Sequence, residues 1–297
     1  MSFLFRKLRE IRIWERIFRE RLSEPLHLNL LSLPVLAFGS VRSKIYFDLL
    51  VRQHHAFGLL RAADKAKNLG NDSVTVLEFG VANGAGLMNI CLLAEKIAAA
   101  TGIQFKVFGF DSGTGMPAPR DYRDHPEHYM TGDFPMQNPD WLQARLPPFA
   151  KLVFGDISET VPRFLSTLSE ESPIGFVSID VDYYWSTVQA LRVFEGRSTQ
   201  YLPTVTLYLD DILFEEHNSW CGELGAINDF NHAHNLRRIE PFNHLRANRL
   251  FKNAKWIDNM FTLHVLDHPW RTPGSKSAAP RVLENPYFLS NQSDAPK

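Results

Sequence analysis

The chain has 297 residues, of which 44% are hydrophobic and 12% aromatic, and its formal net charge is −1. This is enough apolar material for one large domain with extensions or for two small ones, and the balanced charge gives no global basic face for nucleic acid. Two distant cysteines, Cys91 and Cys221, exclude a disulfide framework and favour a reducing, cytoplasmic compartment. No run of eighteen apolar residues is present, so we expect no membrane-spanning helix.

Residues 1–22 contain no proline or glycine, and their apolar side chains recur at three- and four-residue steps, which predicts an amphipathic helix. The other face of this helix carries seven Lys or Arg against three Glu. Two interpretations stay open: the helix packs on its own domain or on a second subunit of a homo-oligomer, or it lies on the inner, anionic face of a membrane. Residues 23–45 include Pro25 and Pro34 and indicate a linker with short pieces of structure. Residues 1–45 are therefore predicted to be a helical extension.

From residue 46 onward, short apolar strands alternate with helices. The expected strands are 74–79, 105–110, 151–156, 174–180, 204–211 and 261–266, and the expected helices are 46–68, 85–100, 159–168, 185–195 and 222–236. This alternation predicts an α/β fold with a Rossmann-like, doubly wound and mostly parallel sheet. We expect the catalytic domain to cover 46–270 and a flexible tail, rich in proline and serine, to cover 271–297.

A glycine-rich turn follows the first strand. The strand ends in Glu78, and Gly80, Gly84 and Gly86 come before the next helix. Glycines here permit a sharp turn and the close approach of a ligand, although a tight strand–helix turn alone also explains them. The spacing is not that of the common dinucleotide fingerprint. A carboxylate at this position would repel a pyrophosphate but suits a cationic ligand such as S-adenosylmethionine.

The short-chain dehydrogenases use the same glycine spacing, and they need a Tyr-x-x-x-Lys pair for catalysis. None of the eight tyrosines has a lysine four residues later, which argues against that class.

The next two strands also end in acids. Asp111 is well placed to accept both hydroxyls of a ribose, and Asp156 could accept from an adenine amino group with Ile157 against the ring. Each of these aspartates could instead cap a turn or helix. Taken together, Glu78, Asp111 and Asp156 are consistent with one adenosine-containing ligand lying across the sheet.

Four further carboxylates follow the fourth and fifth strands. Asp180 and Asp182 are two apart and so share a face if the strand continues, and Asp210 and Asp211 end the fifth strand. If these strands are neighbours, the carboxylates meet at one edge and repel one another. A hard divalent cation such as Mg²⁺ would relieve the repulsion, whereas ordinary strand-end caps and surface salt bridges are the alternative.

Aromatic and histidine-rich segments surround these carboxylates in the sequence. The run Tyr183 to Trp185 either packs in the core or forms a stacking wall for a ring-shaped acceptor. The long loop 112–140 contains His125 and His128, and loops of this length inside compact domains are often lids.

These motifs, in their order, resemble one known family. The segments LEFGVANGAG, FGFDSGTGMP, FGDISETVP, IDVDYYWST, LDD and GELGAINDF resemble the macrocin O-methyltransferase family, over roughly residues 46–266. Its members are class I enzymes that use S-adenosylmethionine and a metal to methylate sugar hydroxyls. Val181 stands where the family prefers glycine.

The resemblance implies a role for each motif residue. Asp182 would be the general base. Mg²⁺ would be held by Asp180, Asp210 and Asp211, and the methyl donor by Glu78, Gly80, Gly84, Asp111, Ser112, Asp156 and Ile157. Apart from the resemblance, the Asn83 side chain is a candidate hydrogen-bond donor to the methionine carboxylate. The partner would then be a sugar or glycan acceptor rather than nucleic acid.

Two other function classes are compatible with parts of the sequence. Metal-dependent glycosyltransferases bind nucleotide-sugar phosphates through an Asp-x-Asp motif, which Asp180-Val181-Asp182 matches, but that chemistry has no need of the glycine-rich turn. A methyltransferase-like fold could also serve as a non-catalytic scaffold at the membrane.

Overall fold

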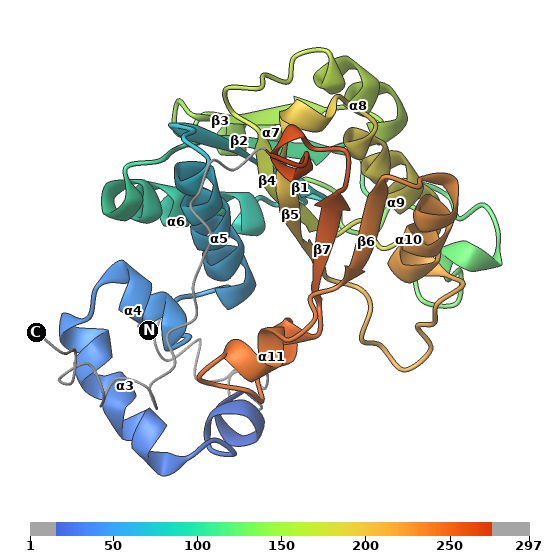
Figure 1. The fold of residues 1–297 in the computed structure, drawn as a ribbon. Coiled ribbons are helices and arrows are strands. Elements are labelled where there is room, and N and C mark those ends of the chain that lie inside the picture. The colour runs from blue at the N-terminus through green and yellow to red at the C-terminus, as the bar shows by residue number, and fades with distance from the viewer. Residues whose placement is uncertain (1–15, 275–297) are drawn as a thin grey trace, which may run out of the picture.

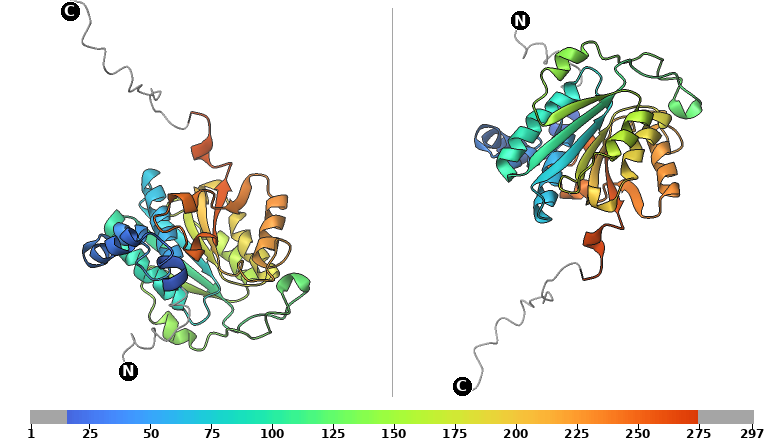
Figure 2. Two further views of the ribbon diagram at one scale, coloured as in Figure 1. Left: turned by 90° about the horizontal axis from the view of Figure 1, so that it is seen from below. Right: turned by 90° about the horizontal axis from the view of Figure 1, so that it is seen from above.

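The computed structural model describes residues 16–274, and Figures 1 and 2 show the arrangement of their elements. Most of the helix predicted over 1–22 lies outside the described residues, as does the predicted tail beyond residue 274. Within the described part, Arg16–Arg21 form a short π-helix, η1. No helix among residues 16–274 is long and apolar enough to cross a membrane.

The centre of the fold is a seven-stranded sheet with the order β3-β2-β1-β4-β5-β7-β6. Its strands are β1 Ser73–Phe79, β2 Gln104–Asp111, β3 Ala150–Phe154, β4 Ile174–Ile179, β5 Tyr201–Leu209, β6 Arg237–Pro241 and β7 Met260–Val265. The first five are parallel, and β7 runs antiparallel to both of its neighbours, β5 and β6. The predicted Rossmann-like, mostly parallel sheet is confirmed.

Helices cover both faces of the sheet (Figure 2). On one side are α5 Gln53–Asn68 and α6 Ala85–Thr101, and on the other are α8 Ile157–Leu165, α9 Tyr184–Leu191 and α10 Gly222–Ala233. Val76 packs into the core of the first side and its neighbour Leu77 into the core of the second. A strand buried on both faces must be apolar throughout, which explains the unbroken hydrophobic run of β1.

Short elements complete the described chain. These are the 3₁₀ turns η2 Tyr122–Asp124, η3 Arg192–Phe194, η4 Ser198–Gln200, η5 Lys255–Ile257 and η6 Pro269–Arg271, and the helices α7 Pro139–Gln143 and α11 Leu245–Asn248. The turn η2 and helix α7 lie in the long connection between β2 and β3, which the sequence predicts as a loop. Asp124 is fully buried there and accepts from the backbone N–H groups of Arg120 and Trp185, at 2.8 and 3.0 Å. These bonds fix the connection against the start of α9.

The segment predicted as a linker is largely helical. It contains α3 Leu26–Phe38, which runs through Pro34, and α4 Val41–Tyr46, which is capped by Ser40. The missing N–H of a proline removes one hydrogen bond, but the leucines of α3 are good helix formers and offset this loss. Large apolar side chains stay exposed on α3: Leu26, Leu30, Leu31, Leu33, Leu36 and Phe38.

A buried ion pair joins the residues that follow α4 to the residue that follows α11. Arg249, which follows α11, donates to Asp48 Oδ1 at 2.6 Å and to the carbonyl oxygens of Ile45 and Tyr46 at 2.8 and 3.2 Å. The side chains of both charged residues are at most 4% exposed. Breaking an ion pair this deeply buried is costly, because water cannot replace the interaction that is lost.

We therefore predict that Arg249→Ala lowers the free energy of unfolding by about 3–5 kcal/mol, since it breaks a buried ion pair and removes the hydrogen bonds to Ile45 and Tyr46. The matched control is Arg246→Ala. Arg246 lies three residues before Arg249, is exposed and is paired with Asp258. An exposed pair contributes about 0–1 kcal/mol. Urea denaturation measures both values, and equal losses in the two variants would contradict the prediction.

Candidate active site

The three predicted metal ligands meet at the carboxyl edge of the sheet. Asp180 follows β4, and Asp210 and Asp211 follow β5, its neighbour, in a register that pairs Ile179 with Leu209. The Asp210 backbone N–H donates to the carbonyl of Ile179 at 3.1 Å, which keeps the two strand ends level. One carboxylate oxygen from each of the three aspartates lies within 4.8 Å of the others. The structure therefore brings these three carboxylates together, as the sequence predicts.

Asp182 reaches this cluster in a different way from the one predicted. Strand β4 ends at Ile179, so the alternation of side chains along a strand does not apply to Asp182. Instead, Asp182 has a φ of +56°, and the N–H of Tyr183 donates to the carbonyl of Val181 at 2.5 Å. This is the hydrogen bond of a γ-turn, and a positive φ at a residue other than glycine is a strained conformation. The side chain of Asp182 is hydrogen-bonded to Asp211 and to Tyr129.

Burial and mutual repulsion make the cluster retain protons in the absence of a cation. Burial, followed by the charges of neighbouring aspartates, raises the pKa of Asp180 to about 8 and the pKa of Asp211 to about 10. Burial also raises the pKa of Asp182, although its hydrogen bonds from Asp211 and Tyr129 oppose the rise. Asp211 is therefore protonated near pH 7 and donates to the Asp182 carboxylate.

Sequence reasoning misses two charged residues of this site. Glu223, in the first turn of α10, is fully buried, and its Oε2 accepts from the backbone N–H of Asp211 at 3.3 Å. Its Oε1 is buried without a hydrogen-bond partner among residues 16–274. A glutamate at a helix start soon after the Asp-Asp pair is a signal that could have found it. Arg52 precedes α5, far upstream in the sequence, and its charge lowers the pKa of Glu78 and Asp180.

Aromatic side chains position Asp210. The Tyr208 hydroxyl donates to Asp210 Oδ1 at 2.5 Å, and its ring stacks on His54 with centroids 3.8 Å apart. Asp210 is exposed whereas Asp211 is buried, so the two neighbours face different surroundings. The stacked pair holds the exposed carboxylate in one orientation.

The glycines after β1 are required by contacts within the protein. Gly80 has a φ of +82°, and a Cβ at this position would lie 1.7 Å from the carbonyl oxygen of Asp180. A Cβ on Gly86 would lie 2.0 Å from Glu78 Oε1, and one on Gly84 would meet the side chain of Leu142. The turn therefore packs directly on the carboxylate cluster and on helix α7.

Glu78 is buried beneath this turn. Its Oε2 has no hydrogen-bond partner in the described part of the chain. Burial, followed by the charge of Asp180, raises the pKa of Glu78 well above its usual value. A buried oxygen without a partner is costly, so this position favours a ligand that brings a donor or a positive charge.

Asp111 connects β2 to the glycine-rich turn. Its Oδ2 accepts from the N–H groups of Val81 and Ala82 at 2.9 and 2.8 Å, and its Oδ1 accepts from Gly113 N–H at 2.6 Å. A carboxylate has about four acceptor positions, so one remains for a ligand hydroxyl. Next to Asp111, the Ser112 hydroxyl is exposed and lies 3.1 Å from the hydroxyl of Thr114.

Two further predicted residues have structural partners. Asn83 Oδ1 accepts from the N–H of Gln137 at 2.9 Å, which joins the glycine-rich turn to the 112–140 segment. Asp156 caps α8 by accepting from Ser158 N–H at 2.7 Å, and Ile157 is the first residue of that helix. Glu78, Asp111 and Asp156 lie at the ends of β1, β2 and β3, which are consecutive in the sheet.

The aromatic run after β4 belongs mainly to the core. Tyr183 and Tyr184 are buried, and the Tyr184 hydroxyl donates to Asp229 Oδ2 at 2.5 Å. Trp185 is half-buried and donates from its ring N–H to Asp121 Oδ2 at 3.3 Å. The core alternative therefore holds for both tyrosines. Trp220, in the connection after β5, is exposed.

Comparisons with known proteins concern the fold. The sequence matches no family model and no curated protein. The calicheamicin methyltransferase CalS11 is 19% identical, with a TM-score of 0.48 over 80% of this chain and 91% of that one. MycE, a mycinamycin-pathway methyltransferase solved with Mg and SAH, is 12% identical, with a TM-score of 0.34 over 79% of this chain and 54% of that one. The plantazolicin methyltransferase BpumL, solved with SAH, is 11% identical, with a TM-score of 0.33 over 80% of this chain and 97% of that one. The strand order and the helices on both faces are those of a Rossmann-like, doubly wound sheet.

The carboxylate cluster predicts how the stability of the metal-free protein depends on pH. The pKa values of Asp180 and Asp211 are higher in the folded protein than the 3.8 of a free aspartate, so the folded state binds more protons between pH 4 and pH 8. Stability therefore falls as the pH rises through this range. We predict that the thermal midpoint in EDTA decreases from pH 5 to pH 8 and that Mg²⁺ restores it at pH 8.

Asp180→Asn removes one of the repelling charges, so the decrease with pH should be shallower in this variant. Asp258→Asn, at an exposed site, is the control and should follow the parent. Differential scanning calorimetry measures the midpoints. Two outcomes would contradict the raised pKa values of Asp180 and Asp211. One is a thermal midpoint in EDTA that rises with pH, and the other is the same dependence of the midpoint on pH in Asp180→Asn and in the parent.

Proposed function

We propose that the protein is an S-adenosylmethionine- and divalent-metal-dependent O-methyltransferase of the macrocin O-methyltransferase type. Its acceptor is a hydroxyl of a sugar or of a glycosylated small molecule or glycan. The observation that carries this proposal is the convergence of Asp180, Asp210 and Asp211 beside a glycine-rich turn that covers the buried Glu78. A cation site and a site for a cationic cosubstrate then share one edge of the sheet.

The residues after β1, β2 and β3 fit the methyl donor. Glu78 Oε2, which is buried without a protein partner in the described structure, suits the positive charge of the methionine portion. The remaining acceptor position of Asp111 suits a ribose hydroxyl, and the second oxygen of Asp156 suits an adenine amino group. Gly80, Asn83, Gly84, Ser112 and Ile157 complete the proposed pocket. When bound, S-adenosylmethionine supplies a methyl group on a sulfonium, which is a good leaving group.

The carboxylates after β4 and β5 fit a hard cation. Asp180, Asp210 and Asp211 would hold it, because all-oxygen sites suit Mg²⁺ and the repulsion among them needs a positive charge nearby. When bound, such an ion lowers the pKa of an acceptor hydroxyl and orients it. Two hydrogen bonds hold these ligands in place before the ion arrives. The Tyr208 hydroxyl donates to the Asp210 carboxylate, and the Glu223 carboxylate accepts from the backbone N–H of Asp211.

Asp182 is the proposed general base. Its carboxylate accepts a hydrogen bond from Tyr129, which favours the charged form that can take a proton. The hydroxyl proton of the acceptor passes to Asp182 as the oxygen attacks the methyl carbon. Tyr129 belongs to the 112–140 segment, so this segment contributes directly to the surroundings of the base. Rate depends on holding oxygen, carbon and sulfur in line, which is the task of the surrounding side chains.

We predict that Asp210→Asn lowers turnover by more than about 100-fold while the affinity for S-adenosylhomocysteine changes little. Loss of an outer-shell partner of a metal already costs about 10–100-fold, so loss of a direct ligand should cost at least as much. Asp180→Asn should behave in the same way. The matched control is Asp140→Asn on α7, an exposed aspartate away from the cluster.

Transfer of a labelled methyl group to a glycan or metabolite extract, followed by mass spectrometry, measures turnover, and calorimetry measures donor binding. Near-parental activity of Asp210→Asn in EDTA would rule out the metal mechanism. Metal-dependent binding of a nucleotide-sugar without binding of S-adenosylhomocysteine would instead identify a glycosyltransferase. Binding of neither would identify a scaffold.

We also propose that the N-terminal region contacts an anionic membrane surface. The six large apolar side chains of α3 that stay exposed offer a surface able to enter the headgroup region. Residues 25–47 contain no Asp or Glu, and residues 1–22 carry seven Lys or Arg, so the charge of the region complements an anionic lipid surface.

We predict that the parent protein sediments with phosphatidylserine-containing vesicles and not with phosphatidylcholine vesicles. The double variant Leu30→Glu, Leu33→Glu should bind the anionic vesicles at least about 10-fold more weakly, because each leucine contributes about 1.5–3 kcal/mol on burial. Leu92→Glu is the control, since Leu92 is an exposed leucine on α6. If the parent does not bind vesicles but forms a dimer that the double variant abolishes, the surface is a subunit interface instead.

A further inference from the structure

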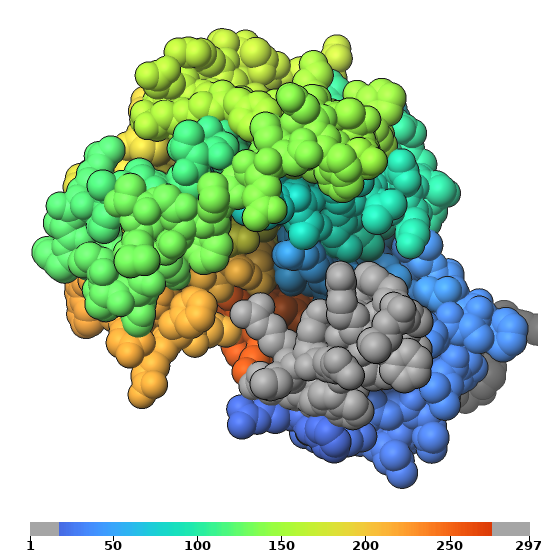
Figure 3. Space-filling view, turned by 180° about the vertical axis from the view of Figure 1, so that it is seen from behind, coloured from blue at the N-terminus to red at the C-terminus, as the bar shows by residue number. Residues whose placement is uncertain are grey.

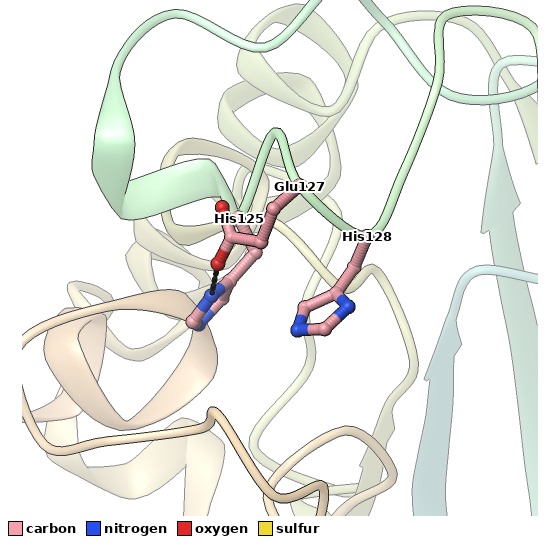
Figure 4. Close-up of side chains that lie close together, drawn as sticks. All are labelled: His125, Glu127 and His128. Atoms are coloured by element: carbon pink, nitrogen blue, oxygen red, sulfur yellow. Dashed lines mark hydrogen bonds and ion pairs between the residues drawn. The ribbon is translucent and has the colours of Figure 1, made fainter.

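A second group of metal-binding side chains lies outside the carboxylate cluster. His125, Glu127 and His128 lie close together in the connection between β2 and β3 (Figure 4). Glu216 and His217, in the connection after β5, face them. Figure 3 shows the face of the molecule on which these two connections, coloured green and orange, lie against each other. None of these histidines and glutamates has a role in the proposed methyl transfer.

The distances in this group match those of a metal-binding site. His125 Nδ1 is 2.9 Å from Glu127 Oε1, and one ligand atom from each of His125, Glu127 and His128 lies within 4.8 Å of the other two. Bonds from zinc to histidine nitrogen or carboxylate oxygen are about 2.0–2.2 Å, so neighbouring ligand atoms around one ion lie about 3–3.5 Å apart. Small movements of the exposed Glu127 and His128 are enough to close the remaining gap.

Glu216, on the other connection, lies near His128 and is a candidate fourth ligand. Glu216 Oε2 is 3.3 Å from His128 Nε2, which is also a separation expected between ligands of one ion. Both Glu216 and Glu127 are exposed, so neither carboxylate has lost its freedom to turn toward a cation. If Glu216 turns toward the other three residues, two imidazoles and two carboxylates can supply the four ligands of a tetrahedral ion.

Two imidazole rings on the buried side of this group each have one ring nitrogen that is unpaired within the described structure; on His125 the nitrogen that faces Glu127 is Nδ1, whereas the unpaired one is Nε2. The His125 side chain is only 2% exposed, and its Nε2 has no hydrogen-bond partner in the described part of the chain. The ring of His217 stacks on it at 4.5 Å and 3°, and His217 Nε2 is also buried without a partner among residues 16–274. Buried polar atoms are nearly always satisfied, so two adjacent imidazoles with unpaired nitrogens are unusual in a purely structural cluster.

We propose that His125, Glu127 and His128, with Glu216 as the fourth ligand, form a second cation site that binds a transition metal such as Zn²⁺. Imidazole nitrogen is a preferred ligand of Zn²⁺ and of its first-row neighbours, whereas Mg²⁺ prefers oxygen ligands and holds its waters strongly. The two centres therefore select different ions: Asp180, Asp210 and Asp211 select a hard cation, and the histidine site a borderline one.

The position of this site indicates a structural role. Three ligands come from the 112–140 segment and one from the connection after β5, so a bound ion cross-links the two connections. Tyr129 follows His128 directly and is hydrogen-bonded to Asp182. The ion would thus hold the segment that contacts the proposed base, without touching the reacting atoms.

Titration of the full-length protein with Co²⁺ and Zn²⁺ tests the site, with Mg²⁺ in saturating excess to occupy the carboxylate cluster. Co²⁺ reports nitrogen ligands and low coordination number through its visible absorption, and calorimetry reports the affinity for Zn²⁺. We expect one equivalent of each ion to bind. His128→Ala and Glu127→Gln should each weaken binding by at least about 10-fold, in line with other losses at metal sites.

Two controls separate this site from other surfaces. His232→Ala removes an exposed histidine on α10 and should bind like the parent. Asp210→Asn should keep the Zn²⁺ affinity, so failure of the proposed methyl-transfer site leaves this result unchanged. Circular dichroism shows whether each variant is folded, and the exposed positions of Glu127 and His128 make loss of folding unexpected.

A metal ion that cross-links the two connections should also protect the connection between β2 and β3 from proteolysis. Arg120 is an exposed trypsin site in the connection between β2 and β3, and Zn²⁺ should slow cleavage there in the parent and in His232→Ala but not in His128→Ala. The absence of Zn²⁺ binding by the parent in excess Mg²⁺, or equal affinities of the parent and His128→Ala, would overturn the proposal. Zn²⁺ binding with no change in trypsin cleavage at Arg120 would show that the ion does not cross-link the two connections.

Discussion

Repulsion among carboxylates at the carboxyl edge of β4 and β5 is the constraint on which the rest of the site depends. Parallel neighbouring strands bring their ends to one edge, so acids at those ends cannot avoid one another. The protein moderates this repulsion with Arg52 and with protons held on Asp180 and Asp211. The cation proposed for this site would neutralise the repulsion among the three carboxylates directly. A cation that binds the folded protein at the proposed site would therefore also stabilise the fold.

The two halves of the proposed site share backbone contacts as well as an edge of the sheet. The carbonyl of Asp180 lies against Gly80, so the turn proposed for the methyl donor touches the first proposed metal ligand directly. Asp111 holds the same turn through two amides, and Asn83 ties it to the 112–140 segment. Donor turn, carboxylate cluster and long connection form one connected unit. A ligand that orders any one of them also restricts the other two.

Much of the fold was predictable, because buried parallel strands are apolar throughout and alternate with helices. The meeting of Asp180, Asp210 and Asp211 was predictable for the same reason. Strand β6 was missed since its residues, RRIEP, are mostly polar and it lies at the edge of the sheet, where no apolar run is needed. Pro25 and Pro34 suggested a linker where α3 forms. Arg52 and Glu223 reach the site through tertiary packing, which no local pattern reports, and Val181, unexplained by the motif, packs on the core.

The left-handed backbone at Asp182 restricts which amino acids this position can accept. Most side chains are strained at a φ of +56°, whereas aspartate and asparagine tolerate it better than others, and glycine tolerates it freely. Glycine would relax the turn but bring no carboxylate, and glutamate would bring the carboxylate but fit the turn poorly. Asparagine keeps both shape and size and removes only the charge. Among the common amino acids, only aspartate meets the demands of the backbone and of the proposed proton transfer together.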